Sequence, residues 1–228
     1  MVALYNGRMC GRYTLTANGN ITAEFFGLDT VPELRPRYNI TPSQLVAVVG
    51  NRPEGQRGLT MLNWGLVCSW ENDPEHGFKP INARAETLRS KPMFRELIES
   101  KRCLIATDGF YEWRKVGTKK IPNHIRLKGG GPMAFAGLWD IWDDGTRRVR
   151  SCCIITTEAN DLVKSIHDRM PVIVPPDRFA EWLDADSPAY KIDGLLLPFP
   201  AEAMEMVPLT TKVNSPKNEG PELLMPAK

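Results

Sequence analysis

Short apolar runs follow one another along the chain, and turn-forming residues separate them. Most of these runs have the length of a β-strand and contain β-branched or aromatic residues, which predicts strands. They lie at 45–50, 59–67, 102–107, 109–115, 123–127, 133–139, 151–157 and 170–174. The polar segment KVGTKK has the composition of a hairpin tip, and the segment GGGP predicts a second break in the strands. The pattern predicts a protein made mainly of strands.

Helical periodicity is found in only three segments. The first, 91–101, follows Ser90, a residue type that caps helices. The second begins after Thr157 and ends just before His167, and the third, 175–183, starts with prolines suited to a first turn. We therefore predict a single α+β domain, in which a mixed, largely antiparallel sheet curls like a barrel and the helices lie at its periphery.

Composition places the chain among ordinary globular proteins. Its 228 residues are 42% hydrophobic and 25% charged, enough for one sizeable core. No run approaches the ~18 apolar residues that cross a membrane. The first thirty residues lack the apolar region of a secretory signal. We expect a cytoplasmic protein with no membrane partner.

The cysteines are odd in number and scattered, and none forms a C-x-x-C pair. They are Cys10, Cys68, Cys103, Cys152 and Cys153. This usage argues against a disulfide framework and against a structural zinc site, and no metal or organic cofactor is implied. Cys10 stands apart because it lies beside glycine and arginine near one end of the chain. It is either one more small core residue or a reactive group.

Positive charge is concentrated in one part of the chain. The net charge of +2 indicates no nucleic-acid partner by itself. Between Trp113 and Trp139, however, there are six basic residues and no acidic one. Such a segment is compatible with a basic face that follows phosphates, and equally with a solvated hairpin. Both interpretations stay open.

Four segments place a reactive polar group in an apolar or aromatic setting: MCGRY, INARAET, GFYEWRK and IHDRMP. In the third, Glu112 lies between Tyr111 and Trp113, and strand alternation puts its side chain on the opposite face from theirs. That carboxyl group either faces solvent or lies in a cleft with a raised pKa, the state a general acid needs. From this segment alone we expect it to face solvent.

The three histidines of the chain and the asparagine of the second segment also allow two readings. His167 follows a predicted helix, whose C-terminus favours the protonated ring, although a single histidine is more often structural than catalytic. His76 lies in a polar loop and His124 in a strand predicted to be exposed. The amide of Asn82 can fix a polar reactant or cap an ordinary turn.

Taken together, the segments resemble the SOS-response-associated peptidase (SRAP) family of covalent abasic-site sensors. The likeness runs through MCGRY, RYNITPSQ, WGL, INARAET, FREL, DGFYEW, FAGLWD, IHDRMPVI and VNSPKNEGPEL, in the family's order. The resemblance implies a SRAP-like domain over 9–228. It also implies a nucleoid-associated monomer that binds single-stranded or junction DNA and captures an abasic sugar.

The family's motifs assign roles to individual residues of this chain. The resemblance implies that the catalytic groups are Cys10, Asn82, Glu112 and His167. It implies that the positions facing DNA or holding the site are Arg12, Asn39, Pro42, Trp70, Arg84 and Arg169. One departure is visible, because Glu71 follows Trp70 where family members can carry a second aromatic residue.

The chemistry implied by the resemblance needs an unprotonated amine. An abasic site exists partly as an open-chain aldehyde, and an α-amino group with a pKa of about 7.7–8.0 is substantially neutral at physiological pH. An N-terminal cysteine carries this amine and a thiol on adjacent carbons. The amine can form an imine with the aldehyde, and the nearby thiol can then close a five-membered thiazolidine.

The start of the chain therefore decides whether this chemistry is possible. If residues precede Cys10, its nitrogen is an amide whose lone pair is delocalised into a carbonyl. We expect residues 1–8 to be a non-native or removable extension, so that loss of Met9 exposes Cys10. Self-cleavage before Cys10 is a second route to the same end.

Two other functions remain open at this point. A cysteine peptidase would use Cys10 as nucleophile and His167 as base, oriented by Asn82 or Glu112, and it would need no free α-amine. A non-covalent reader of modified bases would not depend on the thiol of Cys10.

Overall fold

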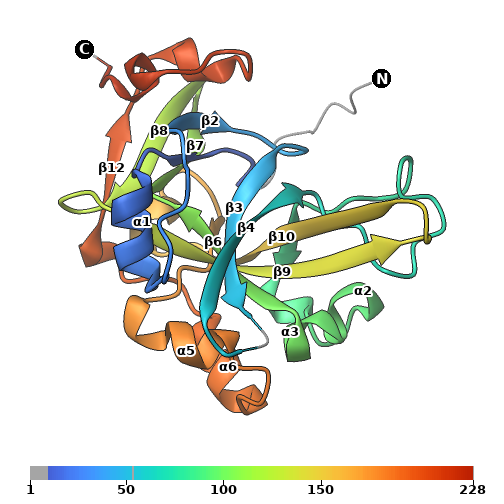
Figure 1. Ribbon diagram of the computed structural model, residues 1–228. Coiled ribbons are helices and arrows are strands. Elements are labelled where there is room, and N and C mark those ends of the chain that lie inside the picture. The colour runs from blue at the N-terminus through green and yellow to red at the C-terminus, as the bar shows by residue number, and fades with distance from the viewer. Residues whose placement is uncertain (1–9, 53, 228) are drawn as a thin grey trace.

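The computed structural model describes residues 10–52 and 54–227, and its centre is a small closed barrel of strands (Figure 1). A seven-stranded sheet contains the order β11-β10-β4-β3-β6-β9, and β9 also pairs with β10. That last pairing closes five of the strands into a ring. They are β3 (Leu45–Asn51), β4 (Arg57–Trp64), β6 (Arg102–Thr107), β9 (Met133–Asp143) and β10 (Arg148–Glu158).

Two short strands extend the barrel along β10 and bring site residues to its edge. They are β5 (Asn82–Arg84) and β11 (Arg169–Pro171). β10 runs parallel to β4 and β5, whereas the other described pairings of this sheet are antiparallel. The sheet is therefore mixed and largely antiparallel, as the sequence predicts.

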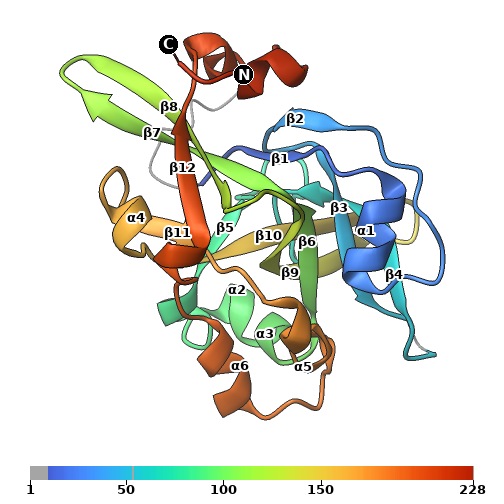
Figure 2. The same ribbon diagram turned by 90° about the vertical axis from the view of Figure 1, so that its left-hand side faces the viewer.

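A second, five-stranded antiparallel sheet lies beside the barrel in the order β12-β8-β7-β1-β2. Its strands are β1 (Tyr13–Leu15), β2 (Arg37–Ile40), β7 (Gly109–Val116), β8 (Lys119–Leu127) and β12 (Met204–Pro208). The chain passes from β6 into β7 through Asp108, so the two sheets are continuous. The outer part of the β7–β8 hairpin extends away from the body of the molecule (Figure 2).

The helices are short and lie outside the sheets (Figures 1 and 2). They are α1 (Gly19–Phe26), α2 (Pro92–Arg95), α3 (Leu97–Ser100), α4 (Asp161–Lys164), α5 (Phe179–Leu183) and α6 (Ala189–Leu195). The 3₁₀ turns are at Ala85–Thr87, Pro176–Arg178, Ala201–Ala203, Thr211–Asn214 and Pro221–Leu224. Among the described residues, no helix is long and apolar enough to cross a membrane.

The core fills the barrel and the space between the two sheets. Tyr13 of β1 meets Trp64 of β4 and Phe135 of β9, with ring centroids 5.2 and 5.8 Å apart and the rings edge-on. Cys152 and Cys153 of β10 are fully buried, as predicted for a core strand. These contacts join β1, which follows Cys10 in the chain, firmly to the barrel.

The predicted helices are only partly confirmed. Segment 91–101 is divided into α2 and α3 at Glu96, and Lys91, not Ser90, precedes its first turn. The hydroxyl of Ser90 instead donates to the Thr87 carbonyl at 3.2 Å. The third segment, 175–183, does form a proline-led turn followed by α5.

The second predicted helix is shorter than expected, and two helices were not predicted. Thr157 belongs to β10, and α4 starts after Asn160, whose side-chain oxygen accepts from Val163 N at 3.0 Å. The helices α1 and α6 were missed. The first has clear signals, because Asn18 caps its start and Gly27, with φ 62°, ends it.

His124 is buried, which corrects the prediction that it lies on an exposed strand. Its Nε2 is 3.1 Å from the hydroxyl oxygen of Thr14, and its ring lies 5.1 Å from that of Tyr111. Burial lowers the pKa of His124 to about 4, so the ring is neutral at physiological pH. It serves as a packing element between β1, β7 and β8.

Gly109→Ala is expected to destabilise the protein by about 1–3 kcal/mol, because overpacking a filled core costs that much. A Cβ at Gly109 would lie 2.1 Å from Nε2 of the buried His124 ring. Urea unfolding measures the loss. Gly50→Ala in β3 is the matched control, since nothing lies within 4 Å of its added carbon. Equal stability of the two variants would contradict this account of the packing.

Candidate functional site

Cys10 lies at the entrance to β1, between the barrel and the second sheet. The backbone N–H of Tyr111 donates to the Arg12 carbonyl at 3.0 Å, which holds this segment alongside β7. The side-chain amide of Asn82, on β5, donates to the Cys10 carbonyl at 3.0 Å. Three segments far apart in the sequence therefore meet at Cys10.

Glu112 is buried on β7, with 5% of its surface exposed, so the expectation that it faces solvent is wrong. Its pKa is raised to about 8, mainly by burial; a hydrogen bond from the Trp113 backbone opposes this shift, and the Asp168 carboxylate contributes to it. Glu112 is therefore largely protonated at neutral pH, and a buried carboxyl in this state can give or take a proton near pH 8.

Both faces of β7 are covered at this position, which explains the wrong expectation. Tyr111, on the opposite face, is fully buried in a cluster with Leu209, Val213 and Leu223 of the C-terminal segment. Alternation correctly assigns the two residues to different faces. It does not reveal that distant segments of the chain cover both faces of β7.

The thiol of Cys10 is neutral in this environment. Cys10 is 1% exposed, and burial raises its pKa well above the ordinary value, with the nearby Glu112 carboxyl adding to the rise. A thiolate here would need a group to take its proton. Glu112 is the ionisable residue whose charge acts on the thiol, which makes it the candidate proton acceptor.

Two buried oxygen atoms of the site have no hydrogen-bond partner among the described residues. They are Oδ1 of Asn82 and Oε1 of Glu112. Such acceptors are uncommon in folded proteins, and each costs about 1–3 kcal/mol if it stays unpaired. Both are available to donors on a bound ligand, such as hydroxyl groups or an amine.

His167 lies just beyond α4, and its ring orientation is set by the backbone. Its Nδ1 lies 3.0 Å from the backbone nitrogen of Arg169 and 3.2 Å from the Arg169 carbonyl oxygen. The ring is 3.3 Å from Asp168 and is partly exposed. Because Asp168 also acts on the Glu112 carboxyl, this segment borders the same site.

Arg169 is held inside the protein by Glu86. The two side chains form a bidentate pair at 2.6 and 3.0 Å, and Arg169 also donates to the Thr156 carbonyl at 2.6 Å. The pair lowers the pKa of Glu86, with the hydrogen bond from Arg169 as the main cause. Sequence reasoning missed Glu86, because no local pattern indicates its partner on β11.

Arg12 and Asn39 tie the C-terminal segment to the second sheet. Arg12 donates to the Asn39 side chain at 2.6 Å and to the Val213 carbonyl at 2.8 Å. The amide of Asn39 donates to the carbonyls of Ser215 and Asn218 at 3.0 and 2.8 Å. Both side chains are thus occupied by internal hydrogen bonds, and any contact with DNA remains a prediction.

The other predicted DNA-facing residues offer free surface. Trp70 is 58% exposed, Arg84 is exposed at the end of β5, and Pro42 is partly exposed. Pro42 precedes Ser43, which has a φ of 68°, a conformation that is unusual for a residue other than glycine and occurs more often near functional sites. Their contacts with DNA also remain predictions.

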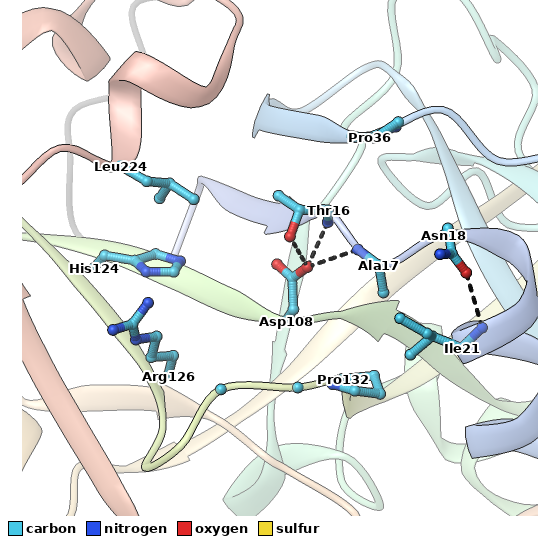
Figure 3. A pocket seen from close by; sticks show the side chains of 12 residues that line it. Thr16, Ala17, Asn18, Ile21, Pro36, Asp108, His124, Arg126, Pro132 and Leu224 are labelled. Atoms are coloured by element: carbon cyan, nitrogen blue, oxygen red, sulfur yellow. Dashed lines mark hydrogen bonds between the residues drawn. The ribbon is translucent and has the colours of Figure 1, made fainter.

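Two cavities of the described structure lie away from the candidate catalytic residues. The first, about 490 Å³, is lined by residues of the β1–α1 turn, β8 and the β8–β9 loop. In Figure 3, Asp108 beside it accepts hydrogen bonds from Thr16 and Ala17, which fixes that turn. The second, about 450 Å³, is lined by residues around Glu86, Arg89 and Leu197. The described lining of neither cavity includes Cys10, Asn82, Glu112 or His167.

The fold and the site together define an α+β protein with a closed barrel, whose edge buries a thiol, an amide and a carboxyl of raised pKa. The family described as SOS response associated peptidase (SRAP) matches residues 9–216. The chain belongs to this family, as the sequence motifs predict.

Proteins similar to this chain cover nearly its whole length. Abasic site processing protein YoaM of Bacillus subtilis is 44% identical over 223 residues, which cover 95% of this chain and 97% of that protein. Abasic site processing protein HMCES of Gallus gallus is 35% identical, covering 84% of this chain and 66% of that protein. A crystal structure of a Bacteroides thetaiotaomicron protein has a TM-score of 0.85 at 27% identity, covering 96% of this chain and 100% of that one. The predicted fold class is thereby confirmed.

Proposed function

We propose that this protein processes abasic sites in DNA by bonding to them covalently through Cys10. The relatives that are 44% identical are named abasic site processing proteins, which supports the substrate. The observation that carries the proposal is the meeting of Cys10 with Asn82 and with a Glu112 carboxyl whose pKa is about 8. The substrate is single-stranded DNA, read by its defect and not by its sequence.

The proposed reaction joins two atoms of Cys10, its α-nitrogen and its sulfur, to one carbon of the sugar. The α-amine of a chain beginning at Cys10 attacks the aldehyde carbon of the open sugar, and loss of water leaves an imine. The thiol then adds to the same carbon while its proton moves to the nitrogen, which closes a thiazolidine. Adjacent placement of the two nucleophiles favours ring closure.

Proton transfer in this scheme falls to Glu112 and His167. Protonated Glu112 can give a proton to the sugar ring oxygen or the departing water, and then take one from the Cys10 thiol. His167 exchanges protons with the sugar and can assist release of a 3′ phosphate. Asn82 holds the Cys10 backbone in line with the carbon under attack.

The remaining residues carried over from the family act on the DNA around the lesion. Arg84 is exposed and can neutralise a flanking phosphate, and Trp70 can stack on a base without regard to sequence. Pro42 adds an apolar contact. Arg169 and Arg12 hold the site through their hydrogen bonds to Glu86 and Asn39.

A cysteine peptidase is the second candidate, because the family is described as a peptidase. A thiol peptidase activates its cysteine by lowering the thiol pKa, commonly beside a histidine. Here the pKa of Cys10 is raised by burial, which is the opposite of what a peptidase turning over other substrates needs. Peptidase chemistry then fits best as self-cleavage before Cys10.

The proposal is tested with a chain that starts at Met9 and single-stranded DNA carrying one abasic site. We expect an adduct that survives heating and runs as one band on a denaturing gel. The same strand without the lesion is the control and should give no such band. Absence of the adduct with the abasic strand, under conditions in which the protein is folded, would exclude covalent capture. A non-covalent reader would show binding without an adduct.

A further inference from the structure

The outer part of the β7–β8 hairpin carries four exposed basic side chains. They are Arg114, Lys115, Lys119 and Lys120. Within the described part of the chain, none of them is in an ion pair, whereas Arg126, lower on β8, pairs with Glu205 at 2.7 Å. The hairpin extends from the body of the molecule (Figure 2). Unpaired charge on a projecting element is available to an anionic partner.

The strand register divides these four side chains between two faces of the hairpin. Arg114 pairs with Ile121 and Val116 pairs with Lys119, whereas Lys115 and Lys120 pair with each other. Because side chains alternate along a strand, Arg114 and Lys119 share one face and the other two lysines share the opposite face.

The face with Arg114 and Lys119 is the one that carries Glu112. The rise along an antiparallel strand places Arg114 about 7 Å beyond Glu112 and the Val116–Lys119 pair about 14 Å beyond it. A row of basic side chains thus leads directly outward from the buried carboxyl of the site.

The opposite face is closed at its base by the C-terminal segment. Trp113, on that face, donates from Nε1 to the Asn214 side chain at 2.7 Å, and its ring lies 5.7 Å from the Arg12 guanidinium. A ligand reaching the Glu112 carboxyl therefore has a basic path along one face of the hairpin, while the other face is blocked at its base.

We propose that the DNA strand flanking the captured site runs along the Glu112 face of the β7–β8 hairpin, with Arg114 and Lys119 contacting its phosphates. The partner is a single strand of DNA. The inference rests on the proposed function for the lesion, but the contact itself is with the sugar–phosphate backbone and is independent of sequence.

The test compares two double variants that lose the same charge from opposite faces. Arg114→Gln with Lys119→Gln removes the proposed contacts, and Lys115→Gln with Lys120→Gln is the matched control. Binding to an undamaged single-stranded oligonucleotide is measured by fluorescence anisotropy over a series of salt concentrations. Thermal unfolding checks that all three proteins are equally folded, since the four side chains are exposed.

The first variant is expected to bind roughly tenfold more weakly, and its log–log salt slope to shrink by about 1.4, because each lost phosphate contact on a single strand removes about 0.7. The control should keep a slope near that of the parent. Equal losses of DNA affinity in the two variants would mean that the hairpin tip acts only through its general positive potential, and this would overturn the proposal. Unchanged affinity in both variants would overturn it as well.

These outcomes are separable from failure of the proposed function. The salt slope is measured on DNA without an aldehyde, so it does not depend on covalent chemistry. If the parent chain starting at Met9 formed no adduct with abasic DNA while the face-specific loss of binding persisted, the hairpin contact would stand and the capture reaction would not. If the parent formed the adduct but the two double variants did not differ in DNA binding, only the proposed hairpin contact would be excluded.

Discussion

A chain that begins at Cys10 is expected to form a heat-stable adduct with abasic DNA, and a chain that keeps residues 1–9 is expected to form none. The free α-amine, with a pKa of about 7.7–8.0, has an available lone pair at neutral pH, whereas a peptide nitrogen does not. The residues before Cys10 lie outside the described part of the structure. Intact mass spectrometry measures the product, whose mass should equal protein plus DNA less one water.

The Cys10→Ser variant of the chain that begins at position 10 distinguishes formation of the carbon–nitrogen bond from formation of the carbon–sulfur bond. It keeps the amine and should form the imine, but its hydroxyl is a poorer nucleophile than the thiol for ring closure. Its adduct should survive heating only after borohydride reduction. A comparable stable adduct without reduction would exclude the thiazolidine. Mass measurement of the extended chain before mixing reveals whether it cleaves itself before Cys10, and crosslinking by a chain that stays intact would contradict the whole scheme.

The strands of the barrel could be predicted from the sequence because each one corresponds to a short run of apolar residues. The apolar runs around Cys152 and Cys103 have the length of strands and are too short for buried helices. The pairing of β9 with β10 follows from their position as neighbouring hairpin strands. Closure of the ring also needs β10 to lie parallel to β4, a long-range pairing that no local pattern indicates. The end of β10 was misread, because Thr157 looks like a helix start although it continues the strand.

The family resemblance pointed to the four candidate catalytic residues. It did not predict how deeply each side chain is buried or which groups surround it. Strand alternation places Glu112 opposite Tyr111 but does not tell whether a distant segment covers it. The segment that does so on the Tyr111 side includes Leu209 and Leu223, about 100 residues further along the chain. The raised pKa of Glu112 comes from its own burial on the other face, near Cys10 and Asp168.

Long-range polar contacts account for the rest of what sequence reasoning missed. Glu86 lies 83 residues from Arg169 and holds its guanidinium in two hydrogen bonds. Asn39 fixes carbonyls of the C-terminal segment 176 and 179 residues away. These side chains satisfy buried backbone and charged groups, a need that appears only once the fold brings them together. The family resemblance instead implies that Arg169 and Asn39 face DNA or hold the site.

Glu112→Gln is expected to slow adduct formation by about 10²–10⁴-fold, the usual contribution of a positioned acid–base group. Glutamine has nearly the same shape but cannot transfer a proton in this range. Single-turnover rates measured from pH 6 to 10 should show the difference. In the parent, the step that needs protonated Glu112 should weaken above pH 8, where this carboxyl ionises, and that alkaline fall should be absent from the variant.

The same substitution is expected to stabilise the protein at high pH. The pKa of Glu112 is about 8 in the folded protein and 4.5 in an unfolded chain, so burial favours the protonated form. Below pH 4.5 both states are protonated and the parent has no penalty. As the pH rises from 4.5 to 8, the unfolded chain ionises first and the parent loses up to about 5 kcal/mol of stability. Glu112→Gln removes this loss, which urea unfolding at pH 5 and pH 9 measures.

The two effects of Glu112→Gln have opposite signs, and this distinguishes a functional carboxyl from a structural one. Glu158→Gln, at an exposed carboxylate at the end of β10, is the control and should change stability by less than about 0.5 kcal/mol at either pH. If Glu112→Gln instead destabilised the protein at pH 9, the carboxylate would have to be held by favourable partners. Its burial would then serve the fold, and proton transfer would have to come from His167 alone.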